Sequence, residues 1–334
     1  MTRALITGLT GFVGSHLLDR LIEHTDWTIY GLVRWRSPLN NIQKHLPLIE
    51  KKERLFLLNG DLRDSTSLEG ALDVSKPDYI FHLAAQSFPK TSFSSPVDTL
   101  DTNILGTCRL LETVRARAPQ SITHICASSE VFGRVPADQV PINEEARFHP
   151  ASPYAISKVG ADLLGRFYAE AYGMNVQTTR MFTHTGPRRG DVFAESNFAK
   201  QIALMERGII PPQIHVGNLK SMRTWADVRD AVRAYHMLVT VDPTPGAYYN
   251  IGGTHSCTIG DMLQTLLKFT PLRPEIVEDK ERLRPIDADL QIPDCAKFQD
   301  KTGWAPQITF EQTMKELLQY WRSEIMRGRS VTYR

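Results

Sequence analysis

Short apolar runs alternate with helix-like segments along the first half of the chain. Runs rich in β-branched and aromatic residues predict strands at 3–7, 28–33, 54–58, 79–83, 122–127 and 176–181. Apolar positions three and four residues apart predict helices at 13–23, 64–72, 102–115 and 153–172. This alternation predicts an α/β fold, a doubly wound parallel sheet with helices on both faces.

Beyond residue 184 the alternation loosens, and prolines punctuate shorter elements. An amphipathic helix is expected at 258–269, with Thr258 as its N-cap. A second helical stripe near the C-terminus is formed by Phe310, Met314, Leu317, Leu318 and Trp321. The pattern predicts a sheet domain over 1–183 and a smaller lobe over 184–330, with some segments of the lobe returning to the sheet domain.

Composition narrows the class of protein. Among 334 residues, 39 Lys and Arg balance 37 Asp and Glu, which is not the footprint of a nucleic-acid or membrane-surface binder. We find neither a spanning apolar run nor a signal peptide in the sequence. The four cysteines lack metal-ligand spacing, so we expect reduced thiols, no bound metal and a cytoplasmic protein. They are Cys108, Cys126, Cys257 and Cys295.

Three glycines follow the first predicted strand. Gly8, Gly11 and Gly14 have the spacing GxxGxxG and stand directly before a predicted helix. Glycines let the backbone approach a pyrophosphate, and a helix N-terminus offers free N–H groups to it. Glycines also serve ordinary tight turns, but this placement between strand and helix favours a dinucleotide site.

The residues at the end of the second predicted strand indicate which dinucleotide this site would bind. NAD-binding units usually place a carboxylate there for the ribose 2′-hydroxyl. This chain has Arg34 and Arg36 instead. Guanidinium groups suit a 2′-phosphate, so we expect NADP, with NAD as the alternative. The structural alternative is a solvated basic loop.

Candidate catalytic residues cluster after the fifth strand and in the long helix. Tyr154 and Lys158 are one helical turn apart and share a face. The ammonium group, with a nicotinamide's positive charge, would lower the phenol pKa and make Tyr154 a proton acceptor. Ser128 could bind the same substrate oxygen, and Glu130 could serve as a second acid or base. Their alternatives are an exposed Tyr–Lys pair and an exposed loop carboxylate.

Several segments together resemble the extended short-chain dehydrogenases/reductases. They are ITGLTGFVGSHL, GDLRD (60–64), HLAAQS (82–87), SSEVFG (128–133) and SPYAISK (152–158). Within that family the chain most resembles GDP-mannose 4,6-dehydratase and its relatives, through HTGPRRGDVF (184–193), VGNLKSMRTWADVRDAV (216–232) and LRPIDADL (283–290). GDP-4-keto-6-deoxymannose reductases share part of this, notably ESNFAKQIA (195–203).

The resemblance implies a role for each matching residue. The catalytic set is Ser128, Glu130, Tyr154 and Lys158. The cofactor-binding set is Gly8, Thr10, Gly11, Phe12, Val13, Gly14, Arg34, Asp61, Leu62, Leu83, Ala84, Ala85, Ser87, Tyr154, Lys158, His184 and Arg189. The GDP-sugar set is Ser87, Asn197, Arg223 and Arg284. The resemblance also implies a homodimer or homotetramer, and a lobe that binds the sugar nucleotide.

The expected activity is 4,6-dehydration of a GDP-mannose-type sugar. Alternatives are a GDP-4-keto-6-deoxy-sugar reductase, another NDP-sugar epimerase or dehydratase, and a non-catalytic dinucleotide sensor on the same fold. The chain departs from the dehydratase pattern at two positions: Thr183 stands where Asn is usual, and Ser128 where Thr is commoner. The Thr183 departure makes bulkier or altered sugars, such as a GDP-heptose, reasonable candidate substrates.

Overall fold

The computed structural model describes residues 1–283 and 290–328. Within them, seven parallel strands form the central sheet in the order β10-β6-β5-β4-β1-β2-β3. They are β1 (Arg3–Thr7), β2 (Thr28–Val33), β3 (Leu55–Asn59), β4 (Tyr79–His82), β5 (Ile122–Cys126), β6 (Val176–Met181) and β10 (Tyr248–Ile251). The strand order reverses beside β1, so the carboxyl ends of β1 and β4 open the crevice where such sheets bind ligands. The predicted α/β class is confirmed.

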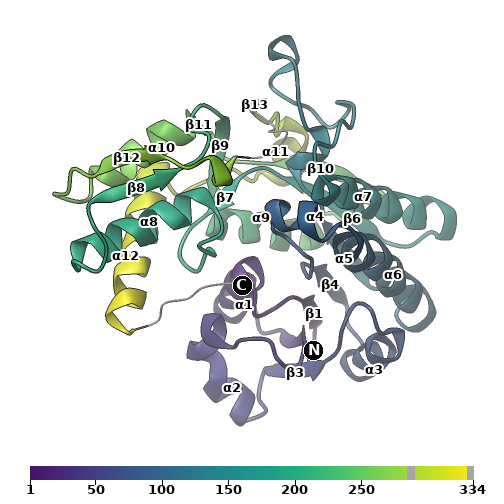
Figure 1. The fold of residues 1–334 in the computed structure, drawn as a ribbon. Coiled ribbons are helices and arrows are strands. Elements are labelled where there is room, and N and C mark those ends of the chain that lie inside the picture. Colours follow the sequence, from purple (N-terminus) through teal and green to yellow (C-terminus); the bar gives the residue numbers. More distant parts are fainter. Residues whose placement is uncertain (284–289, 329–334) are drawn as a thin grey trace.

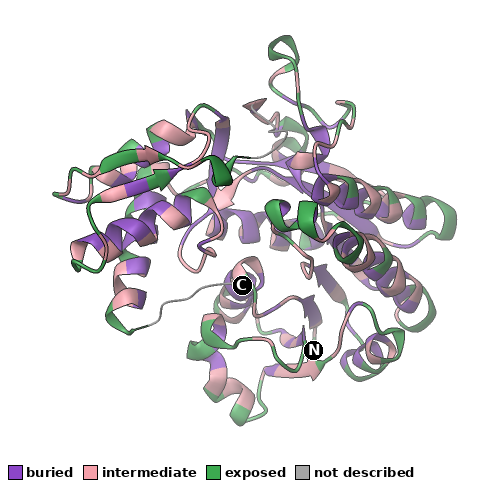
Figure 2. Ribbon diagram, viewed as in Figure 1, coloured by how far each residue is buried: buried purple, intermediate pink, exposed green. Residues whose placement is uncertain are grey.

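Helices cover both faces of this sheet (Figure 1). On one face lie α1 (Phe12–His24), α9 (Val228–Thr240) and α11 (Ala296–Thr302). On the other lie α3 (Ser65–Ser75), α6 (Gly106–Arg117) and α7 (Pro153–Tyr172). Figure 2 shows the strands buried between helices whose outer faces are exposed. Strands covered on both faces explain why the sequence has continuous apolar runs rather than alternating ones.

The predicted elements appear close to their expected bounds, with one exception. All six predicted strands lie within one residue of their observed ends. The predicted helix at 102–115 is helical throughout, but α5 (Pro96–Leu100) leads into α6 through a π-helical segment, η2 (Asp101–Leu105), which the sequence pattern did not predict. In η2 the amide of Asn103 bonds the backbone of Gln86, a tertiary contact that helical periodicity does not record.

A separate hydrophobic cluster lies among segments that follow residue 184. The helices α8 (Ala194–Glu206), α10 (Ile259–Leu267) and α12 (Phe310–Met326) pack there with β8 (Gln213–Val216) and β9 (Met222–Asp227). Thr258 caps α10 through a capping box, as predicted. The predicted stripe of α12 buries Met314, Leu317, Leu318 and Trp321. Strand β9 pairs with β7 (His184–Thr185), β11 (His255–Thr258) and β13 (Leu290–Gln291), and β8 pairs with β12 (Glu275–Glu278).

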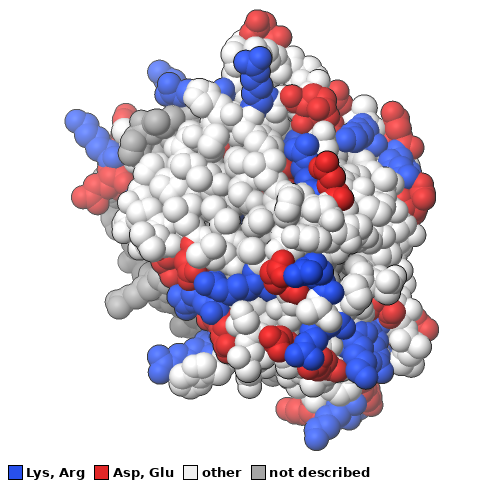
Figure 3. Space-filling view, turned by 90° about the vertical axis from the view of Figure 1, so that its right-hand side faces the viewer, with Lys and Arg blue, Asp and Glu red and all other residues white. Residues whose placement is uncertain are grey.

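Short elements complete the described chain: α2 (Leu46–Glu50), α4 (Pro89–Ser94), η1 (Asn40–His45), η3 (Ser129–Phe132), η4 (Ala137–Gln139) and η5 (Lys280–Arg282). Across residues 1–283 and 290–328, none of the helices combines the length and apolar character needed to cross a bilayer. The same residues hold no cluster of three or more His, Cys, Asp or Glu side chains placed to bind a metal ion. On the face in Figure 3, basic and acidic side chains are interspersed around a broad uncharged area.

Candidate active site

The backbone of the turn between β1 and α1 lies so close to neighbouring backbone that two of its positions have no room for a side chain. Gly8 has φ +73°, and a Cβ there would lie 2.9 Å from the backbone N and Cα of Ala84. A Cβ on Gly14 would lie 2.3 Å from the carbonyl oxygen of Gly8. The N-cap of α1 is Gly11, which has no side chain to occupy the N–H groups of the first turn. The turn therefore presents free N–H groups and a positive helix end to an anion.

A buried hydroxyl at the end of β1 holds the segment that follows β4. Thr7 Oγ1 accepts hydrogen bonds of 3.1 Å from the backbone N–H groups of both Leu83 and Ala84. The same oxygen lies 2.9 Å from Nδ1 of His82, whose Nε2 lies 2.9 Å from Oγ1 of Thr107. Burial lowers the pKa of His82 to about 3, so the ring is a neutral link in this chain. Sequence reasoning assigned no role to His82, although it opens the segment HLAAQS, or to Thr107, because both act through buried hydrogen bonds between distant parts of the chain.

The expected adenosine-side residues lie after β2 and β3. Arg34 is exposed, and its charge helps to lower the pKa of Asp61. Burial, the largest single cause, acts to raise the pKa of Asp61, but the hydrogen bonds and charge of Arg63 and the charge of Arg34 together lower it. Leu62 is buried, and its Cβ lies 2.9 Å from where a Cβ on Gly106 would stand, so α6 approaches this strand end closely. Neighbouring strand ends thus bring Arg34 and Asp61 together, as parallel pairing requires.

The four predicted catalytic residues meet at the carboxyl end of β5. Ser128 caps η3 by accepting a 3.2 Å hydrogen bond from the N–H of Glu130. A hydrogen bond with Ser128 acts to lower the pKa of Tyr154, whereas the charge of Glu130 acts to raise it, so both groups lie near the phenol. The Nζ of Lys158 is 5.9 Å from the centre of the Tyr154 ring.

Burial governs the protonation of this group in the chain alone. Tyr154 is 8% exposed and Lys158 7%. Burial raises the pKa of Tyr154 well above its usual value and lowers that of Lys158. Lys158 donates a 2.8 Å hydrogen bond to the carbonyl of Cys126, which fixes its position. The expected lowering of the phenol pKa therefore depends on positive charge that a bound cofactor would add.

Hydrogen bonds from buried amide and hydroxyl groups hold the start of α7. Asn103 accepts a 2.8 Å hydrogen bond from the N–H of Gln86 and donates one of 2.8 Å to Ser157. The hydroxyl of Ser157 donates to the carbonyl of Tyr154 at 2.6 Å. The π-helical turn of η2 is what places Asn103 between these partners, in keeping with the frequent location of π-turns at functional sites. The sequence signal that was available is the Asn in the segment DTNILGT.

Two residues of the lobe reach the glycine-rich turn. The His184 ring stacks on Phe12, with centres 5.9 Å apart and planes 10° apart. The guanidinium of Arg189 lies 5.1 Å from the Phe12 ring centre and bonds Glu195 at 3.1 Å. The positive charge of Arg189 also acts to lower the pKa of Tyr154. Burial lowers the pKa of His184 to about 3, and its Nε2 is buried without a hydrogen-bond partner among the described residues.

The remaining predicted residues are placed as follows. Asn197 on α8 bonds the carbonyl of Asp191 at 3.1 Å and accepts from Arg282 at 2.7 Å. Arg223 lies in β9, 9% exposed. Thr10, Phe12, Val13 and Ala85 are partly exposed and Ser87 is exposed, while Arg284 lies outside the described residues.

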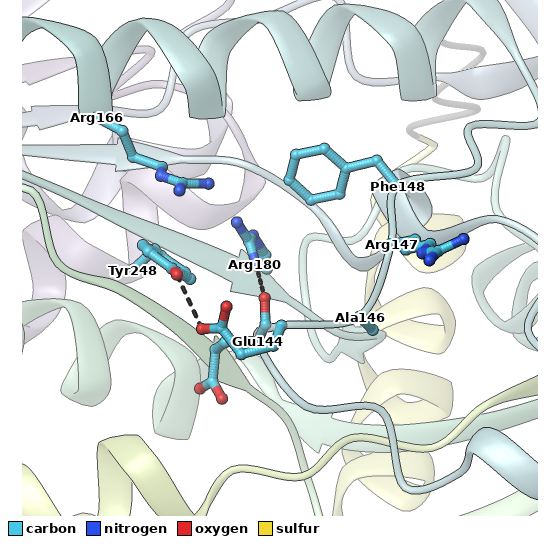
Figure 4. Close-up of a pocket in the computed structure, with 8 residues that line it drawn as sticks. Glu144, Ala146, Arg147, Phe148, Arg166, Arg180 and Tyr248 are labelled. Atoms are coloured by element: carbon cyan, nitrogen blue, oxygen red, sulfur yellow. Dashed lines mark hydrogen bonds between the residues drawn. The ribbon is translucent and has the colours of Figure 1, made fainter.

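A separate polar pocket lies at the edge strand β10 (Figure 4). Its volume is about 220 Å³, and none of its lining residues is a predicted site residue. Arg180, which is buried, forms a bidentate ion pair with Asp162 there. Tyr248 donates a 2.8 Å hydrogen bond to Glu145. Arg180 and Tyr248 in this lining are thus already paired with carboxylates.

Comparison with known proteins gives a consistent result. A family model described as GDP-mannose 4,6 dehydratase matches residues 5–317. The chain is 32% identical over 324 residues to the GDP-6-deoxy-D-mannose reductase of Pseudomonas aeruginosa, covering 97% of this chain and 98% of that protein. It is 33% identical over 325 residues to GDP-mannose 4,6 dehydratase 1 of Arabidopsis thaliana, covering 94% and 88%.

One solved structure is similar over its whole length. It is RMD from Pseudomonas aeruginosa complexed with NADPH, with a TM-score of 0.82 at 31% identity, covering 97% of this chain and 100% of that one. The order of the motifs, the sheet topology and these matches agree. The chain belongs to the GDP-mannose 4,6-dehydratase family of the extended short-chain dehydrogenases/reductases.

Proposed function

We propose that this protein is a 4,6-dehydratase that converts a GDP-linked mannose-type sugar to its 4-keto-6-deoxy product, using NADP. The coarser statement, a nicotinamide-dependent enzyme that modifies nucleotide sugars, follows from its family. The observation that carries the finer one is Glu130 beside Tyr154 and Ser128. A dehydratase needs a second acid–base group next to the tyrosine, and a simple reductase does not.

The residues fit a dinucleotide. Without side chains at Gly8 and Gly14, the turn can bind a pyrophosphate through its backbone N–H groups. The buried Nε2 of His184 could form a further hydrogen bond with the dinucleotide. Arg34, exposed at the end of β2, supports NADP over NAD because its guanidinium can bind a 2′-phosphate.

The mechanism assigns each proton to a residue. A bound nicotinamide dinucleotide supplies a hydride acceptor and donor. Tyr154 Oη takes the proton of the C4 hydroxyl as that carbon is oxidised, and Ser128 holds the same oxygen. The 4-ketone acidifies the C5 proton, which Glu130 removes. Glu130 then protonates the departing C6 hydroxyl, which leaves as water. A bound cofactor would supply to C6 the hydride taken from C4, and the proton held by Tyr154 would be delivered to C5, so that there is no net redox change.

Recognition of the sugar nucleotide is proposed for the lobe over 184–330. Asn197, Arg223 and Arg284 would hold the diphosphate and sugar, because guanidinium groups bind phosphate oxygens in pairs. Ser87 would contact the sugar from the sheet domain over 1–183. Because Thr183 stands where Asn is usual, we propose a GDP-heptose as the alternative substrate to a GDP-hexose.

The second candidate is a 4-keto-6-deoxy-sugar reductase. One observation favours it: the match to the Pseudomonas aeruginosa reductase covers 98% of that protein, against 88% of the Arabidopsis dehydratase. In such a reaction Tyr154 and Lys158 would do all the proton work, and Glu130 would be a bystander.

Glu130→Gln distinguishes these candidates, since the amide keeps the shape and loses the base. In a dehydratase, reduced nicotinamide should accumulate in a single turnover with GDP-mannose, with little loss of water seen by mass spectrometry. In a reductase, the same variant should reduce a GDP-4-keto-6-deoxy sugar at nearly the wild-type rate. Tyr154→Phe is the matched control, because it should block either reaction by about 10²–10⁴-fold. A wild type that dehydrates no GDP-sugar contradicts the dehydratase proposal.

We also propose that the chain works as a homodimer or homotetramer. Exposed apolar side chains line the outer face of α7 and the adjoining η2, namely Leu105, Ile156, Leu163 and Phe167. The packing of Ile104 against Gly160 shows that these two elements are neighbours. An apolar face of this kind suits a second copy related by a twofold axis. The four free cysteines support a reducing compartment, and we propose the cytoplasm.

A further inference from the structure

Arg188 holds a backbone conformation that ordinarily selects glycine. The N–H of Arg189 donates to the carbonyl of Gly186 at 3.2 Å, which closes a β-turn with Pro187 second and Arg188 third. Arg188 has φ +71°. Pro at the second position and positive φ at the third define a type II turn, whose third residue is usually Gly or Asn. An arginine there costs conformational energy, so its side chain is expected to have a role.

That side chain joins three parts of the chain. Its Nη2 donates to the carboxylate of Asp19 and, at 3.0 Å, to Nδ1 of His16, both on α1. Its Nη1 donates to the carbonyl of Asn41 at 3.1 Å. Asn41 in turn donates from its side chain to the carbonyl of Thr10 at 3.0 Å. A continuous set of hydrogen bonds therefore runs from the turn at Arg188 to the glycine-rich turn.

The protonation states of this cluster are consistent with its geometry. The Nε2 of His16 lies 2.8 Å from the carbonyl of Pro187, so that nitrogen carries the proton and Nδ1 accepts from Arg188. Burial, together with the Arg188 charge, lowers the pKa of His16 to about 4, and the ring is neutral. The side chains of Arg188 and Asp19 are only 16% and 13% exposed, so the ion pair is shielded from water.

The three connected stretches are those expected to contact one dinucleotide: the glycine-rich turn, the segment after β2, and the segment that carries His184 and Arg189. We propose that Arg188 is a positioning residue that clamps these stretches together and sets the place of Arg189 against Phe12. This inference rests on the cofactor part of the proposed function. Arg188 itself is engaged by Asp19, His16 and Asn41 rather than by the cofactor.

The test uses Arg188→Gly, which suits the turn and removes the clamp. We expect the dissociation constant for NADPH, measured by titration calorimetry on the purified chain, to rise on the order of tenfold. The melting temperature should stay near the wild-type value, because relief of the positive-φ strain offsets the lost ion pair. Arg188→Lys should recover little affinity, since a lysine cannot reach three partners in different directions.

Two further variants keep the outcome interpretable. Asn41→Ala should weaken NADPH binding in the same direction, and its effect should not multiply with that of Arg188→Gly, because both break one connection. Arg322→Gln removes a comparable ion pair with Glu206 in the lobe, and it should lower the melting temperature but leave the NADPH affinity unchanged. Unchanged affinity in Arg188→Gly and Asn41→Ala overturns the positioning role alone. A wild type that binds neither NADPH nor NADH overturns the cofactor assignment, and this inference with it.

Discussion

At the scale of single residues, the protonation of Tyr154 is the central chemical question. A phenol buried beside Glu130 is disfavoured as an anion, and its pKa is raised in the chain alone. Hydrogen bonding with Ser128 and the charge of Arg189 oppose that rise. The positive nicotinamide ring proposed above would add to those two effects. In the proposed reaction, Tyr154 is therefore expected to accept a proton only after the cofactor has bound.

Arg34 is the residue on which cofactor choice is expected to depend. Arg34→Ala should lose on the order of tenfold in NADPH affinity, as expected for one hydrogen bond to a charged group. NADH, which lacks the 2′-phosphate, should bind nearly as before. Calorimetric titration with both dinucleotides measures the change, and Arg147→Ala, an exposed arginine elsewhere, serves as control. Tighter binding of NADH than NADPH by the wild type would contradict the NADP proposal.

At the scale of elements, the β1–α1 turn tolerates no side chain at its third glycine. Gly14→Ala places a methyl group 2.3 Å from the Gly8 carbonyl oxygen and 2.8 Å from Leu9 Cα, so the backbone must shift. We expect the free energy of unfolding to fall by about 1–3 kcal/mol, as for overpacked cores, and dinucleotide binding to be lost. Urea denaturation and calorimetry measure the two effects.

The matched control is Gly70→Ala in α3, where nothing lies within 4 Å of the added Cβ. That change should raise the free energy of unfolding by about 0.5–1 kcal/mol, the usual gain of Ala over Gly in a helix. If Gly14→Ala binds NADPH as well as Gly70→Ala does, the close approach of this turn to the cofactor is refuted.

At the scale of the whole molecule, buried neutral histidines make stability depend on pH. Burial lowers the pKa of His16 to about 4 and those of His82, His124 and His184 to about 3, from 6.5 when unfolded. Below pH 6.5 these histidines bind protons in the unfolded chain but remain neutral in the folded chain. The contribution of these histidines to the free energy of unfolding is therefore fully present above pH 6.5. It is lost as the pH falls towards 4, by at most about 1.4 kcal/mol per pH unit for each histidine.

Urea denaturation at several values between pH 7.5 and 5 tests this dependence. Carboxylates remain largely ionised in that window, so the slope reports the histidines. His124→Gln, which removes one buried titrating ring, should reduce the slope by the share of one proton. A free energy of unfolding that does not change between pH 6.5 and 5 would show that these rings are not held neutral.

Assembly is tested on the apolar face of α7. Phe167, which is 52% exposed, should become buried between two copies. Phe167→Glu is expected to shift the wild-type dimer or tetramer towards monomer in sedimentation velocity at micromolar concentration. Ile209→Glu, at a 60% exposed position outside this face, should leave the assembly intact. A wild type that sediments as a monomer rules out the proposal.

Local rules determined most of the fold. Strand positions, the N-cap at Thr258 and the doubly wound class follow from short-range patterns, because periodicity and capping depend on near neighbours. The sequence also located the glycine-rich turn, and it placed Ser128, Tyr154 and Lys158 at a strand end and a helix start.

Tertiary structure decided what depends on distant contacts. The π-helical turn at η2 is accompanied by hydrogen bonds of Asn103 with Gln86 and Ser157, distant partners that no local pattern encodes. The seventh strand, β10, joins the sheet from residues 248–251, because an edge strand is selected by pairing with β6 and not by its own short run. The Arg188 cluster likewise joins segments about 170 and 147 residues apart. Its members are ordinary polar residues in the sequence, and only the fold brings His16, Asp19 and Asn41 around one guanidinium.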